Sequence, residues 1–222
     1  MKRSLMAAVL LATAALPAYA SNLPELDGEI SRLQHEWARI KYSVGDTKAQ
    51  GQQMMSLADQ ANALVAKFPT RAEPLIWDGI ITSSAAGIAG GLDALSLVKK
   101  ARDMLEKAEQ LDAKALEGSA ATSLGSLYYQ VPGFPLGFGN NKTARRYLEQ
   151  SLAQNPDGID PNFFYGDFLY RQGDYQKAAD ALRHALAAPD RPGREDADSG
   201  RRSEIKQLLA EIDHKLERKK KS

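Results

Sequence analysis

Residues of the types that carry catalysis or bind metals are few in this sequence, and they are scattered. The three histidines, His35, His184 and His214, lie far apart along the chain, with no HxxxH pattern or carboxylate arrangement beside them. A structural or catalytic metal site needs several such ligands at close, regular spacing. We therefore interpret these histidines as surface residues on polar helix faces, and we predict no metal site and no cofactor.

Nucleophilic chemistry is also poorly supported. The chain has no cysteine, which removes thiolate catalysis, cysteine zinc sites and lipid attachment through an N-terminal cysteine. The serines between residues 83 and 126 lie outside any G-x-S-x-G turn, and the glycines between residues 87 and 91 lack the Lys-Ser/Thr of a phosphate loop. We predict that the protein is not an enzyme. A hydrolase would require folding to bring distant groups together, for example around Asp167 with a strongly raised pKa.

The first twenty residues have the form of a secretory signal peptide. Lys2 and Arg3 precede an apolar stretch over residues 5–16, and Ala18-Tyr19-Ala20 is a cleavage pattern. We expect cleavage after Ala20 and export to the periplasm of a bacterial cell envelope. The alternative, a lone membrane anchor, is disfavoured by Pro17 and by the short apolar stretch. Because no second apolar run follows, we expect no integral membrane segment after cleavage.

The charge balance argues against polyanionic partners. The chain holds 29 Lys and Arg against 28 Asp and Glu, and loss of Lys2 and Arg3 leaves 27 against 28, a formal charge of −1. Such a balance creates no global field that favours nucleic acid or anionic membrane. The basic run at residues 218–221 is interpreted as a solvated helix end. We expect no nucleic-acid partner.

An internal repeat identifies the elements that must position the other residues. A pattern of small and large apolar residues recurs after 34 residues, and a similar pattern occurs earlier in the chain. The members are Ala144, Leu148, Ser151 and Leu152, then Ala178, Leu182, Ala185 and Leu186, and earlier Ala101, Leu105, Ala108 and Leu111. Small residues let an antiparallel helix approach while leucines fill the groove beside it. Each segment follows a predicted first helix with a glycine for close packing, at Gly79, Gly125 or Gly166.

Two more apolar stripes predict a helix pair before these repeats. They cover residues 26–44 and 49–68. Thr70 and Glu73 have the spacing of a capping box, which would begin the next helix.

The C-terminal part divides into a linker and a closing helix. Residues 189–200 are polar and contain Pro and Gly, which is typical of a linker, and residues 201–222 form an amphipathic helix with a basic tail. Stacked repeats leave an open apolar end that a last helix can cover. We therefore expect a repeat domain over residues 21–188 followed by a C-terminal capping helix.

The last repeat unit resembles the tetratricopeptide-repeat (TPR) family. It reads DPNFFYGDFLYRQGDYQKAADALRHALAAPD from Asp160, and the order Gly-Asp-Tyr-x-x-Ala from Gly173 to Ala178 is that of the second helix in this family. Asp160 before Pro161 predicts the start of the first helix. The resemblance implies an all-α fold, an α-solenoid of TPR-like helix hairpins with about four pairs and a C-terminal capping helix.

One loop interrupts the repeats. Residues 131–141 read VPGFPLGFGNN, and the prolines and glycines cannot continue a helix. Phe134 and Phe138 in this loop either contact a partner or fold back to fill the gap that the loop opens. The small residues of segment 82–92 likewise predict either a hinge or a tight helix contact.

This loop, followed by Asn155-Pro-Asp-Gly-Ile-Asp160, adds a narrower resemblance over roughly residues 74–210. It is similar to the T component of tripartite ATP-independent periplasmic (TRAP) transporters. The resemblance implies a periplasmic helical protein, able to form a homo-oligomer, that associates with a substrate-binding protein and accepts a small hydrophobic or anionic ligand. The chain lacks the lipid-attachment cysteine of related lipoproteins, so membrane tethering is not carried over.

The predicted binding residues lie on the first helices, one turn from the packing glycines, or in the loop. They are Thr122, Ser126, Tyr129, Phe134, Phe138, Asn140, Phe163, Asp167 and Tyr170. Helical repeats present their first helices on a concave face, where peptides or partner helices bind. We predict a periplasmic TPR-type adaptor that binds a protein or peptide. The alternative is a T-component-like accessory protein of a TRAP system, which binds a small-molecule ligand or the substrate-binding protein.

Overall fold

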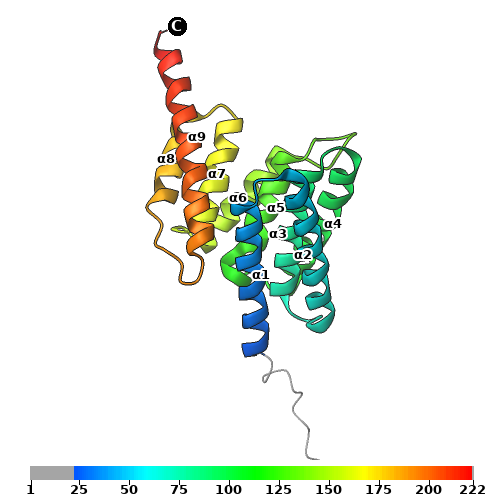
Figure 1. Ribbon diagram of the computed structural model, residues 1–222. Helices are drawn as coiled ribbons and strands as arrows, with labels where there is room; N and C mark the ends of the chain where they lie inside the picture. Colours follow the sequence, from blue (N-terminus) through cyan, green and yellow to red (C-terminus); the bar gives the residue numbers. More distant parts are fainter. Residues whose placement is uncertain (1–22, 222) are drawn as a thin grey trace, which may run out of the picture.

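The computed structural model describes residues 23–221 (Figure 1). Within this range the chain folds into nine α-helices and one short 3-10 helix, and it contains no strand. The helices are α1 (Leu23–Ser43), α2 (Thr47–Lys67), α3 (Ala72–Ala89), α4 (Gly91–Leu111), η2 (Ala115–Gly118), α5 (Ser119–Gln130), α6 (Asn141–Gln154), α7 (Ile159–Arg171), α8 (Tyr175–Leu186) and α9 (Glu195–Lys221). The prediction of four helix pairs and a C-terminal helix is confirmed.

Successive helices pack as antiparallel hairpins, and the hairpins stack side by side. The pairs are α1 with α2, α3 with α4, α5 with α6, and α7 with α8. Apolar stripes explain this arrangement, because each helix buries one face against its partner and another against the next pair. The fold is therefore an all-α array of TPR-like hairpins.

Three glycines set the distance between paired helices, as the sequence predicted. A Cβ atom on each of them would lie within 2.6–2.7 Å of the Cγ atom of a buried leucine on the partner helix. The pairs are Gly79 with Leu105, Gly125 with Leu148, and Gly166 with Leu182. Any larger residue would push the two helices apart, so the same close contact recurs in three successive hairpins.

Two predicted helix starts are wrong. Helix α3 begins at Ala72 with Arg71 at the cap position and no side-chain cap, so Thr70 and Glu73 form no capping box; Glu73 pairs with Arg71 instead. Helix α7 begins at Ile159 with Gly158 at the cap position, two residues before the start that an Asp160 cap would give. The carboxylate of Asp160 binds two arginines from the C-terminal part, and these ion pairs replace the cap.

The segment of small residues over 82–92 is not a hinge within the helix. Helix α3 continues to Ala89, and Gly90 turns the chain into α4 with a φ of 70°. Ala85 and Ala86 are buried. The close-packing interpretation is the one that the structure supports.

Helix α9 differs from a simple end cap. It begins at Glu195 rather than at residue 201, and it contacts α1 as well as α7 and α8 (Figure 1). At Gly200 a Cβ atom would lie 2.5 Å from ring atoms of Tyr42, so α9 and α1 touch without an intervening side chain on α9. The C-terminal helix therefore joins the last hairpin to the first one and borders the concave side of the array.

No helix within residues 23–221 is both long and apolar enough to cross a bilayer. The expected signal peptide at residues 1–20 lies outside the described part of the chain.

Candidate functional site

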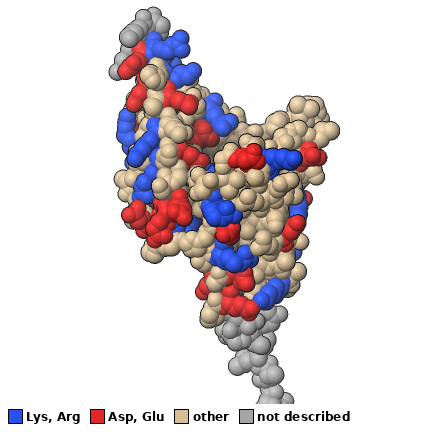
Figure 2. All heavy atoms as spheres, in the orientation of Figure 1, with Lys and Arg blue, Asp and Glu red and all other residues tan. Residues whose placement is uncertain are grey.

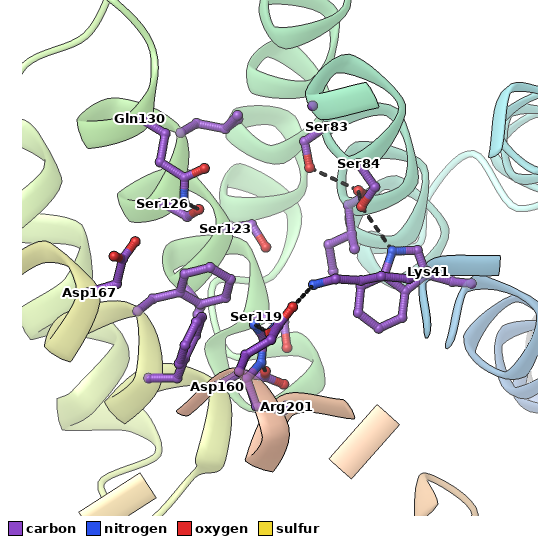
Figure 3. Close-up of a pocket in the computed structure, with 18 of the residues that line it drawn as sticks. Lys41, Ser83, Ser84, Ser119, Ser123, Ser126, Gln130, Asp160, Asp167 and Arg201 are labelled. Carbon is purple, nitrogen blue, oxygen red and sulfur yellow. Dashed lines mark hydrogen bonds and ion pairs between the residues drawn. The ribbon is translucent and has the colours of Figure 1, made fainter. Parts of the chain in front are cut away.

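A pocket of about 1400 Å³ occupies the concave side of the array (Figure 3). Its walls come mainly from the first helix of each hairpin, α1, α3, α5 and α7, and from the start of α9. Because these helices are far apart in the sequence, the pocket exists only when all four hairpins and α9 are assembled.

One wall of the pocket is lined with hydroxyl groups. Ser119, Ser123 and Ser126 lie on one face of α5, at the spacing of successive helical turns. The Ser119 hydroxyl donates to the Leu116 carbonyl at 2.6 Å, and Ser126 accepts from the Gln130 side chain at 2.9 Å. This wall offers hydrogen-bonding groups along about two turns of helix.

A second pair of serines lies across the pocket on α3. The hydroxyls of Ser83 and Ser84 each donate to the Ile80 carbonyl at 2.8 Å, and Ser84 also accepts from the indole nitrogen of Trp37 at 2.9 Å. A nucleophilic serine needs a base within hydrogen-bond reach, and no histidine is among the residues that line the pocket. The pocket serines are therefore arranged for hydrogen bonding.

Asp167 is likewise engaged in structural contacts. Its carboxylate accepts from the Tyr129 hydroxyl at 2.7 Å and pairs with Arg171 at 3.1 Å. Burial, and then the charge of Asp167, raise the pKa of Tyr129 well above its usual value. Tyr129 therefore keeps its proton and holds the Asp167 carboxylate in place.

Charged residues cross-link the helices at the other end of the pocket (Figure 3). The Asp160 carboxylate on α7 forms ion pairs with Arg201 on α9 and with Arg191 in the segment before α9, each at 2.8 Å. Glu204 on α9 then binds both Arg201 at 2.5 Å and Lys41 on α1 at 3.0 Å. The chain of contacts ties α7, α9 and α1 together around the pocket.

The environment shifts the pKa values of this cluster. Burial alone would raise the pKa of Asp160, but Arg201 and Arg191 outweigh it and hold the pKa well below its usual range. Burial, and then the charge of Arg201, lower the pKa of Lys41 to about 8, against the opposing effect of Glu204. Asp160 is thus firmly ionised, whereas Lys41 is a cation near its titration point.

Four of the nine predicted binding residues line this pocket. They are Thr122, Ser126, Phe163 and Asp167. The Thr122 side chain is buried and hydrogen-bonds to Ser151, whereas Phe163 lies beneath the guanidinium of Arg201 at 4.2 Å from the ring centroid. These four side chains contribute to the pocket wall, and their role in binding stays a prediction.

The other predicted residues lie elsewhere. Tyr129 and Tyr170 are not among the pocket-lining residues, and the Tyr170 hydroxyl donates to Glu211 at 3.1 Å. Asn140 caps α6 by accepting from the backbone N–H of Thr143 at 2.9 Å. These contacts give Tyr170 and Asn140 evident structural roles.

The two loop phenylalanines have opposite environments. Phe138 packs edge-on against Tyr128 at 5.3 Å, with the guanidinium of Arg102 at 4.7 Å. Phe134 is 94% exposed, and Leu136, which lines the pocket, is 71% exposed. The loop tip, at the upper right in Figures 1 and 2, is free of charged side chains. Phe138 therefore packs inward, whereas Phe134 is exposed away from the pocket lining and Leu136 is exposed at the pocket rim.

Sequence reasoning missed three side chains of the pocket: Lys41 on α1, Arg194 just before α9, and Arg201 on α9. One signal was present: Arg201 lies on the same helix face as Ala197 and Ile205, which are buried. A charged residue on an apolar face indicates a buried partner. Its partner, Asp160, was instead interpreted as a helix cap.

Comparison with known proteins supports the repeat. Residues 136–194 match a family model described as tetratricopeptide repeat, a range that contains α6, α7, α8 and the turn at Gly173. No curated protein matches the chain. Within residues 23–221, no group of three His, Asp or Glu side chains is placed to hold a metal ion.

Proposed function

We propose that this tetratricopeptide-repeat protein is a periplasmic adaptor that binds a segment of a partner protein in its concave pocket. Such repeats generally serve as non-enzymatic modules for protein interaction. The observation that carries the proposal is that α1, α3, α5, α7 and α9 together enclose one continuous pocket. The export signal at residues 1–20 supports the compartment.

The size of the pocket favours an extended segment. Sites for single small molecules usually measure roughly 300–1,000 Å³, and this pocket reaches about 1400 Å³. The serines of α5 are spaced along the helix, so they can meet successive peptide groups of a bound chain. A peptide backbone offers one donor and one acceptor per residue, which hydroxyl groups can satisfy because they both donate and accept.

Apolar side chains supply the complementary contacts. Phe163, Phe164 and Trp37 line the pocket beside the serines, and Leu136 projects at its rim. Aromatic residues of this kind contribute strongly to protein interfaces because they bury large areas at low entropic cost. The mixture of hydroxyl groups and rings is suited to a segment with both polar and apolar side chains.

A photo-crosslinking amino acid at Ser123 tests this proposal directly. Ser123 lines the pocket, and within residues 23–221 its side chain has no hydrogen bond that a replacement would remove. The matched control is the same amino acid at Ser56, which is exposed on α2 outside the pocket. After irradiation in periplasm of the source cells, we expect a protein adduct at position 123 and none at position 56. Equal adducts at both positions, or none at position 123, would refute the proposal.

A second candidate is the accessory role of a TRAP transporter T component, with a small ligand in the pocket. The contact between α9 and α1 favours it, because this contact closes one side of the concave surface. The result is an enclosed pocket, which suits a small molecule better than an open groove does. Native mass spectrometry of the purified protein distinguishes the two functions. A retained small molecule that the Ser123→Trp variant loses supports the accessory role, and this candidate also predicts a homo-oligomer under the same conditions.

A further inference from the structure

One arginine in the charged end of the pocket has no acidic partner. Arg191 and Arg201 both pair with Asp160, and Arg191 also pairs with Asp198. Arg194 lines the same pocket but forms no ion pair within residues 23–221. Glu204 pairs with both Lys41 and Arg201. This cluster thus holds four cations, Arg191, Arg194, Arg201 and Lys41, against the three anions Asp160, Asp198 and Glu204, a formal charge of +1.

The Arg194 guanidinium is held in a defined position. It lies over the ring of Trp77, 5.2 Å from the centroid. Its Nε atom is buried and has no hydrogen-bond acceptor within the described chain. Burial, and then the charge of Arg191, lower the pKa of Arg194 from its usual value, but the group stays protonated at neutral pH because guanidinium is so basic.

Trp77 provides a second donor of the same kind. Its side chain is only 4% exposed, it lines the pocket, and its indole nitrogen has no acceptor among the described residues. The contrast with Trp37 is clear, since the Trp37 indole donates to Ser84 at 2.9 Å. An indole N–H can only donate, so any partner of Trp77 must be an acceptor.

Two buried donors without acceptors, on side chains that contact each other, are costly in a folded protein. A buried polar group without a hydrogen bond costs about 1–3 kcal/mol. A negatively charged acceptor would satisfy both donors and the excess positive charge at once. A planar carboxylate fits this requirement, because guanidinium binds it through two parallel N–H bonds.

We infer that Arg194 and Trp77 form a subsite for a carboxylate group at the charged end of the pocket. The inference rests on the proposed function and names the chemical group by which the bound molecule is recognised. The carboxylate belongs either to the C-terminus of a peptide or to a small organic acid, since both present the same planar anion.

Paired probes test the subsite and distinguish its two sources. One pair is octanoate and octanamide, and the other is a hydrophobic tetrapeptide with a free C-terminus and the same peptide with a C-terminal amide. Both tryptophans of the chain, Trp37 and Trp77, line the pocket, so tryptophan emission reports binding directly. We expect at least one acid to bind about tenfold or more tightly than its amide, as a charge-assisted hydrogen bond requires.

The variant Arg194→Gln should abolish this preference for the acid. The control Arg183→Gln should keep it, because Arg183 is exposed on α8 and is absent from the pocket lining. Arg194→Lys retains the charge without the planar fork, and we expect an intermediate preference. This variant also provides the test if Arg194→Gln does not fold.

Three results would refute the proposed subsite. Equal affinity of acid and amide for the wild-type protein refutes it, as does no binding of either acid, or an acid preference that survives Arg194→Gln. A protein adduct at position 123 would still support the proposed function in these cases. Conversely, acid binding that depends on Arg194 without any adduct at position 123 would support the subsite and refute the protein partner.

Discussion

The substitution Gly166→Ala tests the contact that sets the spacing of the hairpins. Its Cβ atom would lie 2.7 Å from Leu182 Cγ, 3.0 Å from Leu182 Cδ2 and 3.3 Å from the Ala178 carbonyl oxygen. Leu182 is fully buried and cannot move aside without displacing its neighbours. Overpacking of this kind costs about 1–3 kcal/mol, whereas replacing a helical glycine by alanine gains about 0.5–1 kcal/mol. We expect a net loss of about 1–2 kcal/mol in the free energy of unfolding.

Gly28→Ala is the matched control. Gly28 is also in a helix, α1, but a Cβ atom there would have no neighbour within 4 Å. Only the gain in helix propensity remains, so this variant should be more stable than wild type by about 0.5–1 kcal/mol. The same chemical change is therefore expected to have opposite signs at the two positions.

A double-mutant cycle with Leu182→Ala isolates the contact itself. That substitution alone should cost about 2–5 kcal/mol, but it removes the two carbon atoms that the new Cβ atom would meet. Gly166→Ala should then be neutral or stabilising in the Leu182→Ala background, with a coupling energy of about 1 kcal/mol or more.

Urea unfolding followed by far-ultraviolet circular dichroism measures the stability of all five proteins: wild type, the three single variants and the double variant. If Gly166→Ala is as stabilising as Gly28→Ala, the close contact between α7 and α8 does not exist as described. A cycle whose effects simply add would contradict the same reasoning.

Three other perturbations address the charged cluster and the loop. Because the pKa of Lys41 is about 8 in the folded chain and 10.5 when unfolded, the unfolded state binds more protons between about pH 8 and pH 10.5, and stability rises across this window. The full rise is on the order of 3 kcal/mol. Lys41→Met should remove it in urea titrations, and a wild-type stability that falls over the same pH range would contradict the reasoning. Asp160→Asn should lower the free energy of unfolding by about 3 kcal/mol, because the buried positive charge of Arg201 loses one of its two carboxylate partners. A loss under about 0.5 kcal/mol would count against the cluster. Phe134→Ser should change the free energy of unfolding by less than about 0.5 kcal/mol, whereas Phe138→Ser should lower it by about 1–2 kcal/mol. Thermal melts in which Phe134→Ser is the more destabilising variant would refute the description of the loop.

The hairpins were predictable because their signals are local. Apolar stripes with a helical period fix which face of each helix is buried, and the spacing of Ala144 and Leu148 recurs at Ala178 and Leu182. Gly166 interrupts a run of large residues with a smaller one, a pattern that predicts close packing. These features depend on a helix and its immediate partner.

The charged end of the pocket was not predictable in the same way. It joins Lys41 near the start of the chain to Arg201 near its end through Glu204, and no local pattern specifies that α9 returns to α1. Asp160 illustrates the difficulty, since an aspartate before a proline favours a helix cap. In the structure the Asp160 carboxylate instead pairs with Arg191 and Arg201, two partners that lie 31 and 41 residues further along the chain.

The central claim, that a partner binds inside the concave pocket, is tested most directly by tryptophan emission during titration with the protein captured at position 123. Trp37 and Trp77 are the only tryptophans of the chain, and both line the pocket. A tryptophan-free segment of the partner should shift their emission with the same midpoint that calorimetry gives for binding. Calorimetric binding that leaves the emission of both residues unchanged would place the partner on another face and contradict the claim.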